Sequence, residues 1–168
     1  NPEMINAVAA VKQKKDILRI GFAGTIYSWH PWKRFLCVLN RWKKNNPESN
    51  LEVHFFGINI ADELITFVES EIPFIQSAIF VYPRMPNLDL MRVLKEFNLL
   101  LLFNDYSFLG TKIFDYLALQ RQILMCYEAD EEAVILKRKY YSVEESSYCS
   151  KRLQAETIEA VNSGIIVK

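Results

Sequence analysis

The chain has 168 residues, which suits one domain with a substantial buried core. Hydrophobic residues make up 51% of it and charged residues 24%, as in an ordinary globular protein. Twenty basic side chains balance twenty acidic ones, so no net field draws the chain to nucleic acid or to an anionic membrane. An anionic ligand must therefore be held by a local group of residues.

Cysteine and histidine are sparse in this sequence. The three cysteines lie far apart and form no C-x-x-C pair, which favours a reducing compartment and a cytoplasmic location. The two histidines, His30 and His54, are too few for the usual zinc clusters, so we expect no metal site. We also expect no transmembrane segment, because no apolar run reaches the length of a bilayer span, and no signal peptide.

Apolar runs and helical periodicity predict alternating strands and helices in the first part of the chain. Residues 1–16 are polar, which is typical of a linker or a short helix. Residues 17–24 form an apolar strand that ends in glycine, and a helix with one apolar and one basic side follows Pro31. Residues 51–57 repeat the strand that ends in glycine, and residues 60–70 predict a second helix.

The same alternation continues further along the chain. Residues 77–82 predict a third strand, and Asn87 is expected to be the N-cap of a third helix. A strand at residues 99–103, a further helix and a strand at residues 122–127 follow. Beyond them the pattern is weaker and predicts two helices and a last strand at residues 163–168.

This order of elements predicts an α/β fold over residues 17–168. The expected architecture is a Rossmann-like, doubly wound, mostly parallel sheet with helices on both faces. Ligands of such sheets bind at the carboxyl ends of the strands, near the point where the strand order reverses. Gly24, Gly57, Pro83 and Gly110 all fall at strand ends on that edge, which makes it the main candidate for a binding site.

Residues 108–124 combine the features of a phosphate-binding segment. A glycine lies where a strand leads into a helix. Four apolar residues share one face of that helix and should pack on the sheet: Ile113, Phe114, Leu117 and Ala118. A glycine loop and a helix start can cradle a ligand that carries phosphates.

Polar residues near these strand ends are candidate ligand contacts, and each also has a structural alternative. Lys112 and Asp115 are three apart, so they lie close together on the helix surface and could hold phosphates and hydroxyls. Asp115 could equally be a solvated residue or an ion-pair partner of Lys112. His30 could contact phosphate or pack beside its aromatic neighbours, and His54, inside a strand, is expected to be structural.

Five segments carry a resemblance to a known family: residues 21–25, 54–57, 82–91, 110–124 and 159–167. The first two are strand ends with glycine, the third leads into a helix, and the fourth has a lysine, an acidic residue and a tyrosine in one helix. Their order and spacing resemble the C-terminal, donor-binding domain of retaining GT-B class glycosyltransferases of the large family-4 (group 1) type.

The resemblance implies nucleotide-sugar binding in one half of a two-domain protein. In the family, the acidic residue at the Asp115 position bonds ribose hydroxyls, and the glycine-loop amides face the diphosphate. The nucleotide-sugar-binding residues that it implies are Gly24, Thr25, His30, Gly57, Tyr82, Arg84, Gly110, Thr111, Lys112 and Asp115.

The implied reaction is transfer of a sugar from a nucleoside diphosphate sugar, with retention and without a metal or other cofactor. The acceptor, a sugar or a lipid-linked sugar, would bind to an N-terminal domain that this chain lacks. We therefore expect the chain alone to transfer no sugar, and we assign no catalytic residue. The resemblance also implies a role in polysaccharide biosynthesis. It is compatible with peripheral attachment of the full-length protein to the inner membrane.

The chain departs from the family pattern at three positions. Ser107 stands where the family often has an acidic residue that contacts the transferred sugar. Thr25 and His30 stand about where basic residues are expected. Two alternatives therefore stay open: a non-catalytic Rossmann-like module that binds a nucleotide or a protein partner, and a nucleotide-sugar epimerase of the same architecture.

Overall fold

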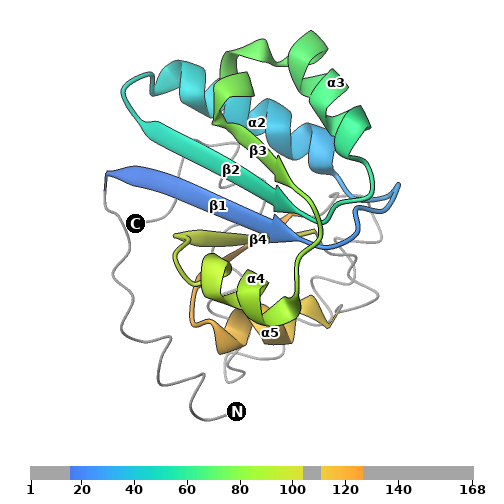
Figure 1. Cartoon of the computed structure of the whole chain (residues 1–168). Helices are drawn as coiled ribbons and strands as arrows, with labels where there is room; N and C mark the ends of the chain where they lie inside the picture. The colour runs from blue at the N-terminus through green and yellow to red at the C-terminus, as the bar shows by residue number, and fades with distance from the viewer. Residues whose placement is uncertain (1–15, 104–110, 127–168) are drawn as a thin grey trace, which may run out of the picture.

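The computed structural model of the protein describes residues 16–103 and 111–126. Within these residues, five parallel strands form one sheet with helices on both faces (Figure 1). The elements in chain order are β1 (Ile17–Ala23), α2 (Trp32–Asn45), β2 (Asn50–Phe56), α3 (Ala61–Glu71), the 3-10 helix η1 (Pro73–Ala78), β3 (Ile79–Tyr82), α4 (Asn87–Leu94), β4 (Leu99–Phe103), α5 (Lys112–Ala118) and β5 (Gln122–Cys126). The predicted α/β, Rossmann-like fold is thereby confirmed.

The strand order β3-β2-β1-β4-β5 places the reversal of the sheet between β1 and β4. The chain runs outward from β1 through β2 to β3 and then crosses back to β4, on the other side of β1. Ile20 pairs with Leu99 and Gly21 with Leu100, so β1 and β4 run side by side toward their carboxyl ends. Sheets of this topology open a crevice for ligands at this point.

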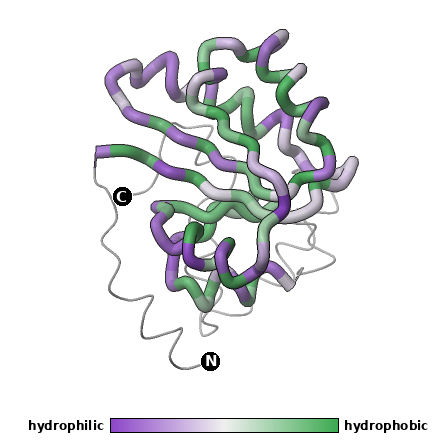
Figure 2. The backbone as a smooth tube through the Cα atoms, in the orientation of Figure 1, coloured by the Kyte–Doolittle hydropathy of each residue, from purple (hydrophilic) through white to green (hydrophobic). Residues whose placement is uncertain are grey.

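Two apolar cores lie on the two faces of the sheet. One packs the sheet against α2, α3 and η1, and the other packs it against α4 and α5. All five residues of β4 are buried because helices cover both of its faces. Figure 2 shows hydrophobic residues interleaved with hydrophilic ones along β1 and β2, and hydrophilic residues at the turn between α2 and β2.

Gly21 lets α4 approach the sheet closely. A Cβ atom at this position would lie 2.9 Å from Cδ2 of Leu94 and 3.0 Å from Cδ1 of Phe97. Such distances are too short for a side chain without movement of its neighbours. The absence of a side chain in the middle of β1 therefore sets the position of α4, whose first turn borders the candidate site.

Two residues predicted at element boundaries have other roles, and in each case a proline lies at the start of the helix concerned. Ser77 was expected in the third strand but belongs to η1, which has Pro73 in its first turn, so β3 begins only at Ile79. Asn87 is not an N-cap: the helix begins at Asn87 itself and its flanking residue is Pro86. The carbonyl oxygen of Pro86 accepts the N–H of Leu90 at 3.0 Å, which moves the helix start one residue earlier.

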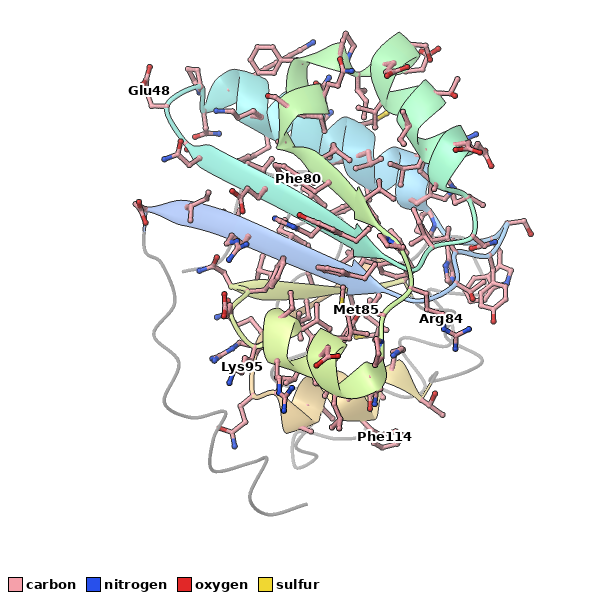
Figure 3. The ribbon with its side chains drawn as sticks, viewed as in Figure 1. Glu48, Phe80, Arg84, Met85, Lys95 and Phe114 are labelled. Atoms are coloured by element: carbon pink, nitrogen blue, oxygen red, sulfur yellow. The ribbon has the colours of Figure 1, made fainter. Side chains whose placement is uncertain are left out.

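The packing face of α5 also differs from the prediction. Phe114 is 68% exposed and points away from the sheet (Figure 3), and Ala118 is exposed as well. The fully buried residues are Ile113, Tyr116 and Leu119, which follow one another at a spacing of three, and Leu117 is partly buried against the same core, so Ile113 and Leu117 pack as predicted. Tyr116 takes the inward position because its hydroxyl has a partner on β1, described below.

Several predicted features lie outside the described residues: the linker, Gly110, Ser107 and everything predicted after Cys126. Among the helices that the structure describes, none is both long and apolar enough to cross a membrane.

Candidate functional site

A pocket of about 550 Å³ lies at the edge of the sheet where the strands end. Its walls come from the residues that follow β1, β2 and β3, from the end of β4 and from the start of α5. Figure 3 shows Arg84 and Met85 at this edge. The volume is in the range of small-molecule sites, and the position is the one that the topology favours.

Seven of the residues predicted to bind a nucleotide sugar line this pocket: Gly24, Thr25, His30, Gly57, Arg84, Thr111 and Lys112. Tyr82 and Asp115 are not among its lining residues, and Gly110 lies outside the described part of the chain. The fold therefore gathers most of the predicted residues in one place, while their ligand roles stay predictions.

Two glycines shape the floor of the pocket through their backbone conformation. Gly24 has a φ of +121° and Gly57 a φ of +63°, values that side-chain-bearing residues rarely adopt. Their N–H groups bind neighbouring strand ends, since Gly24 donates to Phe56 O at 3.1 Å and Gly57 to Tyr82 O at 2.9 Å. Without side chains, both positions let a ligand come close to the backbone.

Lys112 and Asp115 form the predicted pair at the mouth of the pocket. The Nζ atom of Lys112 lies 3.3 Å from Oδ2 of Asp115, and both side chains are more than one third exposed. A Cβ on Gly24 would lie 3.7 Å from Cε of Lys112, so the lysine passes directly over this glycine. An anion above Gly24 would find the ammonium group within reach and would compete with Asp115 for it.

Tyr116 joins α5 to the end of β1, a contact that the sequence reasoning missed. Its buried hydroxyl oxygen accepts the N–H of Ala23 at 3.1 Å. Burial raises the pKa of Tyr116, so the hydroxyl stays protonated. This bond fixes the helix that carries Lys112 against the residue before Gly24.

Replacing Tyr116 with phenylalanine is expected to lower the free energy of unfolding by about 2 kcal/mol, because the buried N–H of Ala23 loses its acceptor. Urea denaturation followed by circular dichroism measures the change. Tyr27→Phe is the matched control, since Tyr27 is 54% exposed and should give a change close to zero. Equal effects of the two substitutions would contradict the role of the buried bond.

His30 closes a tight turn in the loop between β1 and α2. Its ring Nδ1 atom accepts the backbone N–H of Tyr27 at 3.2 Å. The backbone N–H of His30 donates to the carbonyl oxygen of Tyr27 at 3.0 Å. Burial lowers the pKa of His30 to about 4, so the ring is neutral at physiological pH. Because Nδ1 accepts, the proton is on Nε2, and His30 offers the pocket a hydrogen-bond donor rather than a cation.

Tyr82 and His54 belong to an aromatic stack on the sheet rather than to the pocket. The ring of Tyr82 lies parallel to those of Phe56, at 4.9 Å, and His54, at 5.6 Å. The Nε2 atom of His54 lies 3.0 Å from Glu52, which also accepts a bond from Arg19 at 2.8 Å. His54 is therefore structural, as its position in a strand indicated.

The further lining residues that the sequence reasoning missed include two large exposed aromatic ones, Tyr27 and Trp29. The sequence feature that could have indicated them is the presence of large aromatic residues directly after a strand that ends in glycine. Their rings are exposed at the rim of the pocket, and they are discussed below.

The same fold occurs in solved protein structures, one of which is a galactosyltransferase. The lipopolysaccharide outer core galactosyltransferase WaaB, in its apo form, matches with a TM-score of 0.55 at 11% identity, over 73% of this chain and 34% of that chain. OtsA, also in an apo structure, matches with a TM-score of 0.56 at 12% identity, over 98% of this chain and 46% of that chain. A mutant of TarM from S. aureus, solved with fondaparinux, α-GlcNAc-glycerol and UDP, matches with a TM-score of 0.50 at 12% identity, over 68% of this chain and 23% of that chain.

No protein-family model matches the chain, and no curated protein matches its sequence. At these identities the structural matches establish the fold alone. The chain spans less than half the length of each of the three matched structures. Its class is thus defined by the fold alone, as a Rossmann-like α/β domain whose fold the galactosyltransferase WaaB shares.

Proposed function

We propose that the chain is the donor-binding domain of a retaining, metal-independent glycosyltransferase of the family-4 type, which binds a nucleoside diphosphate sugar. The observation that carries the proposal is the pocket at the reversal point of the sheet, where Gly24, Gly57 and Lys112 meet. The fold is shared with a galactosyltransferase and with a protein solved with UDP, which supports a nucleotide-sugar ligand.

The chemistry of the pocket suits a diphosphate. Lys112 and Arg84 supply positive charge, and the neutral His30 supplies an N–H donor. Donors that face the leaving diphosphate stabilise the negative charge that grows on it as the glycosidic bond breaks. Protein groups would then provide the stabilisation that a divalent cation gives in other transferases.

Asp115 is assigned to the ribose of the donor. Its carboxylate lies 3.3 Å from Nζ of Lys112, which lines the pocket, and an ionised carboxylate can accept hydrogen bonds from two neighbouring hydroxyls. The acceptor is assigned to a second domain, because the chain spans less than half of the matched structures. The chain alone is expected to bind the donor and to transfer no sugar.

Binding of UDP, GDP and ADP and of their glucose or mannose conjugates, measured by calorimetry and by thermal shift, tests the proposal. We expect one nucleoside diphosphate to bind, and Asp115→Asn to weaken its binding about tenfold, or about 1.4 kcal/mol, through the lost charge-assisted bonds. Asp89→Asn is the matched control, because Asp89 forms an equivalent i,i+3 ion pair with Arg92 on α4.

If none of the nucleoside diphosphates binds, the proposed function is wrong. If Asp89→Asn weakens binding as much as Asp115→Asn, the ribose assignment is wrong. Assays of the full-length protein then separate the alternatives: sugar transfer supports a transferase, consumption of the donor without an acceptor supports an epimerase, and binding without turnover supports a non-catalytic module.

A further inference from the structure

Two exposed aromatic rings stand at the rim of the pocket. Tyr27 is 54% exposed and Trp29 is 48% exposed, and both line the pocket. Their rings are parallel within 2°, with centroids 5.6 Å apart. Large aromatic surfaces left in water beside a pocket are typical of ligand contacts. We call Tyr27 and Trp29 the aromatic pair.

Contacts with buried and neighbouring residues hold the loop that carries the aromatic pair in place. The N–H of Ile26 donates to Oδ1 of Asn59 at 2.8 Å, and Ile26 itself is buried. The ring of His30 meets both rings edge-on, at 4.1 Å from Trp29 and 5.3 Å from Tyr27. His30 also packs on Phe103 at the end of β4, at 5.3 Å. The rings are therefore positioned before any ligand binds, which lowers the entropic cost of stacking.

The aromatic pair and Asp115, the proposed ribose contact, come from elements on opposite faces of the sheet. The loop after β1 leads to α2 on one face, whereas α4 and α5, with Lys112 and Asp115, lie on the other face (Figure 1). The Cε atom of Lys112 would lie 3.7 Å from a Cβ on Gly24, so this lysine reaches from α5 to the start of the loop. A ligand with its diphosphate at Gly24 and its ribose at Asp115 would therefore extend its sugar toward the loop of the aromatic pair.

We infer that the aromatic pair stacks against the apolar face of the sugar ring of the donor and selects for that sugar; this inference rests on the proposed function. The C–H bonds on one face of a pyranose carry partial positive charge and match the electron-rich face of an aromatic ring. In this arrangement we assign the Nε2–H of His30, whose ring contacts both aromatic rings, to a hydroxyl of the same sugar. The nucleobase is the other part of the ligand that could stack on an aromatic ring. In this arrangement it lies beyond the ribose, on the side of Asp115.

The test compares each nucleoside diphosphate with its sugar conjugate, using UDP with UDP-glucose, GDP with GDP-mannose and ADP with ADP-glucose. Calorimetry on wild type, Trp29→Ala, Tyr27→Ala and the ring-preserving Tyr27→Phe gives the affinities. We expect each alanine variant to bind the sugar conjugate five- to tenfold more weakly, with no change for the diphosphate alone. Tyr27→Phe keeps the aromatic ring, so its loss of affinity for the conjugate should be smaller than that of Tyr27→Ala, and upfield ring-current shifts of the sugar C–H protons should appear with wild type and fade in Trp29→Ala.

Two results would overturn the inference while the proposed function stands. One is unchanged affinity for the conjugate in both alanine variants. The other is an equal loss for the diphosphate and its conjugate, which would place the nucleoside on the aromatic pair. If wild type binds no nucleoside diphosphate, the proposed function fails first and the inference fails with it. Thermal unfolding of each variant checks the fold, which should be intact because both rings are exposed.

Discussion

Replacing Gly57 with alanine is expected to lower the free energy of unfolding by about 2–3 kcal/mol and to weaken nucleoside diphosphate binding at least tenfold. Its φ of +63° is in the left-handed region, which costs a residue with a Cβ about 1–2 kcal/mol. The added Cβ would also lie 3.2 Å from Cα and 3.3 Å from Cβ of Arg84, so the segment after β3 must move. Because Gly57 and Arg84 both line the pocket, that movement changes the shape of the site.

Gly57→Asn separates the two causes of this loss. Asparagine tolerates the left-handed region better than alanine does, but its Cβ meets Arg84 at the same distance. We therefore expect Gly57→Asn to be less destabilised than Gly57→Ala in urea denaturation while losing a similar share of its binding. Wild-type binding in both variants would show that the contact with Arg84 does not shape the site.

The strands, and the apolar residues that form the cores, could be predicted from the sequence because their patterns lie within short segments of the chain. The apolar run at Leu99–Phe103 and the helical spacing that begins at Trp32 need only local reading. The glycines at strand ends indicated, for the same reason, the edge of the sheet at which the pocket lies. The errors at Ser77 and Asn87 arose because a nearby proline started its own turn or helix.

The remaining features depend on contacts between distant residues. The bond from Ala23 to Tyr116 spans 93 positions, and it turns α5 so that Tyr116 faces inward and Phe114 outward. The loop of the aromatic pair is held by Asn59, 33 positions from Ile26. No periodicity in a single segment carries such information, so the sequence located the pocket and seven of its lining residues but not the contacts that hold them in place.

Lowering the pH from 7.5 to 4.5 is expected to destabilise the wild type by about 2–3 kcal/mol more than His30→Gln. Burial lowers the pKa of His30 from 6.5 to about 4, so above pH 6.5 neither the folded nor the unfolded chain carries the proton. Between pH 6.5 and 4 the unfolded chain takes it up and the folded chain does not. Stability therefore falls with pH through this window, by about 1.4 kcal/mol for each pH unit between the two pKa values.

Free energies of unfolding from urea titrations at the two pH values measure this difference, and glutamine keeps a polar side chain that does not titrate. His54→Gln is the matched comparison. Burial lowers the pKa of His54 as well, but its hydrogen bond to Glu52 opposes this, so the effect of the substitution on pH dependence should be smaller. If wild type and His30→Gln lose the same stability, His30 is not held neutral by burial. It could then serve as a cation toward phosphate, and the assignment of its Nε2–H as a neutral donor would fall.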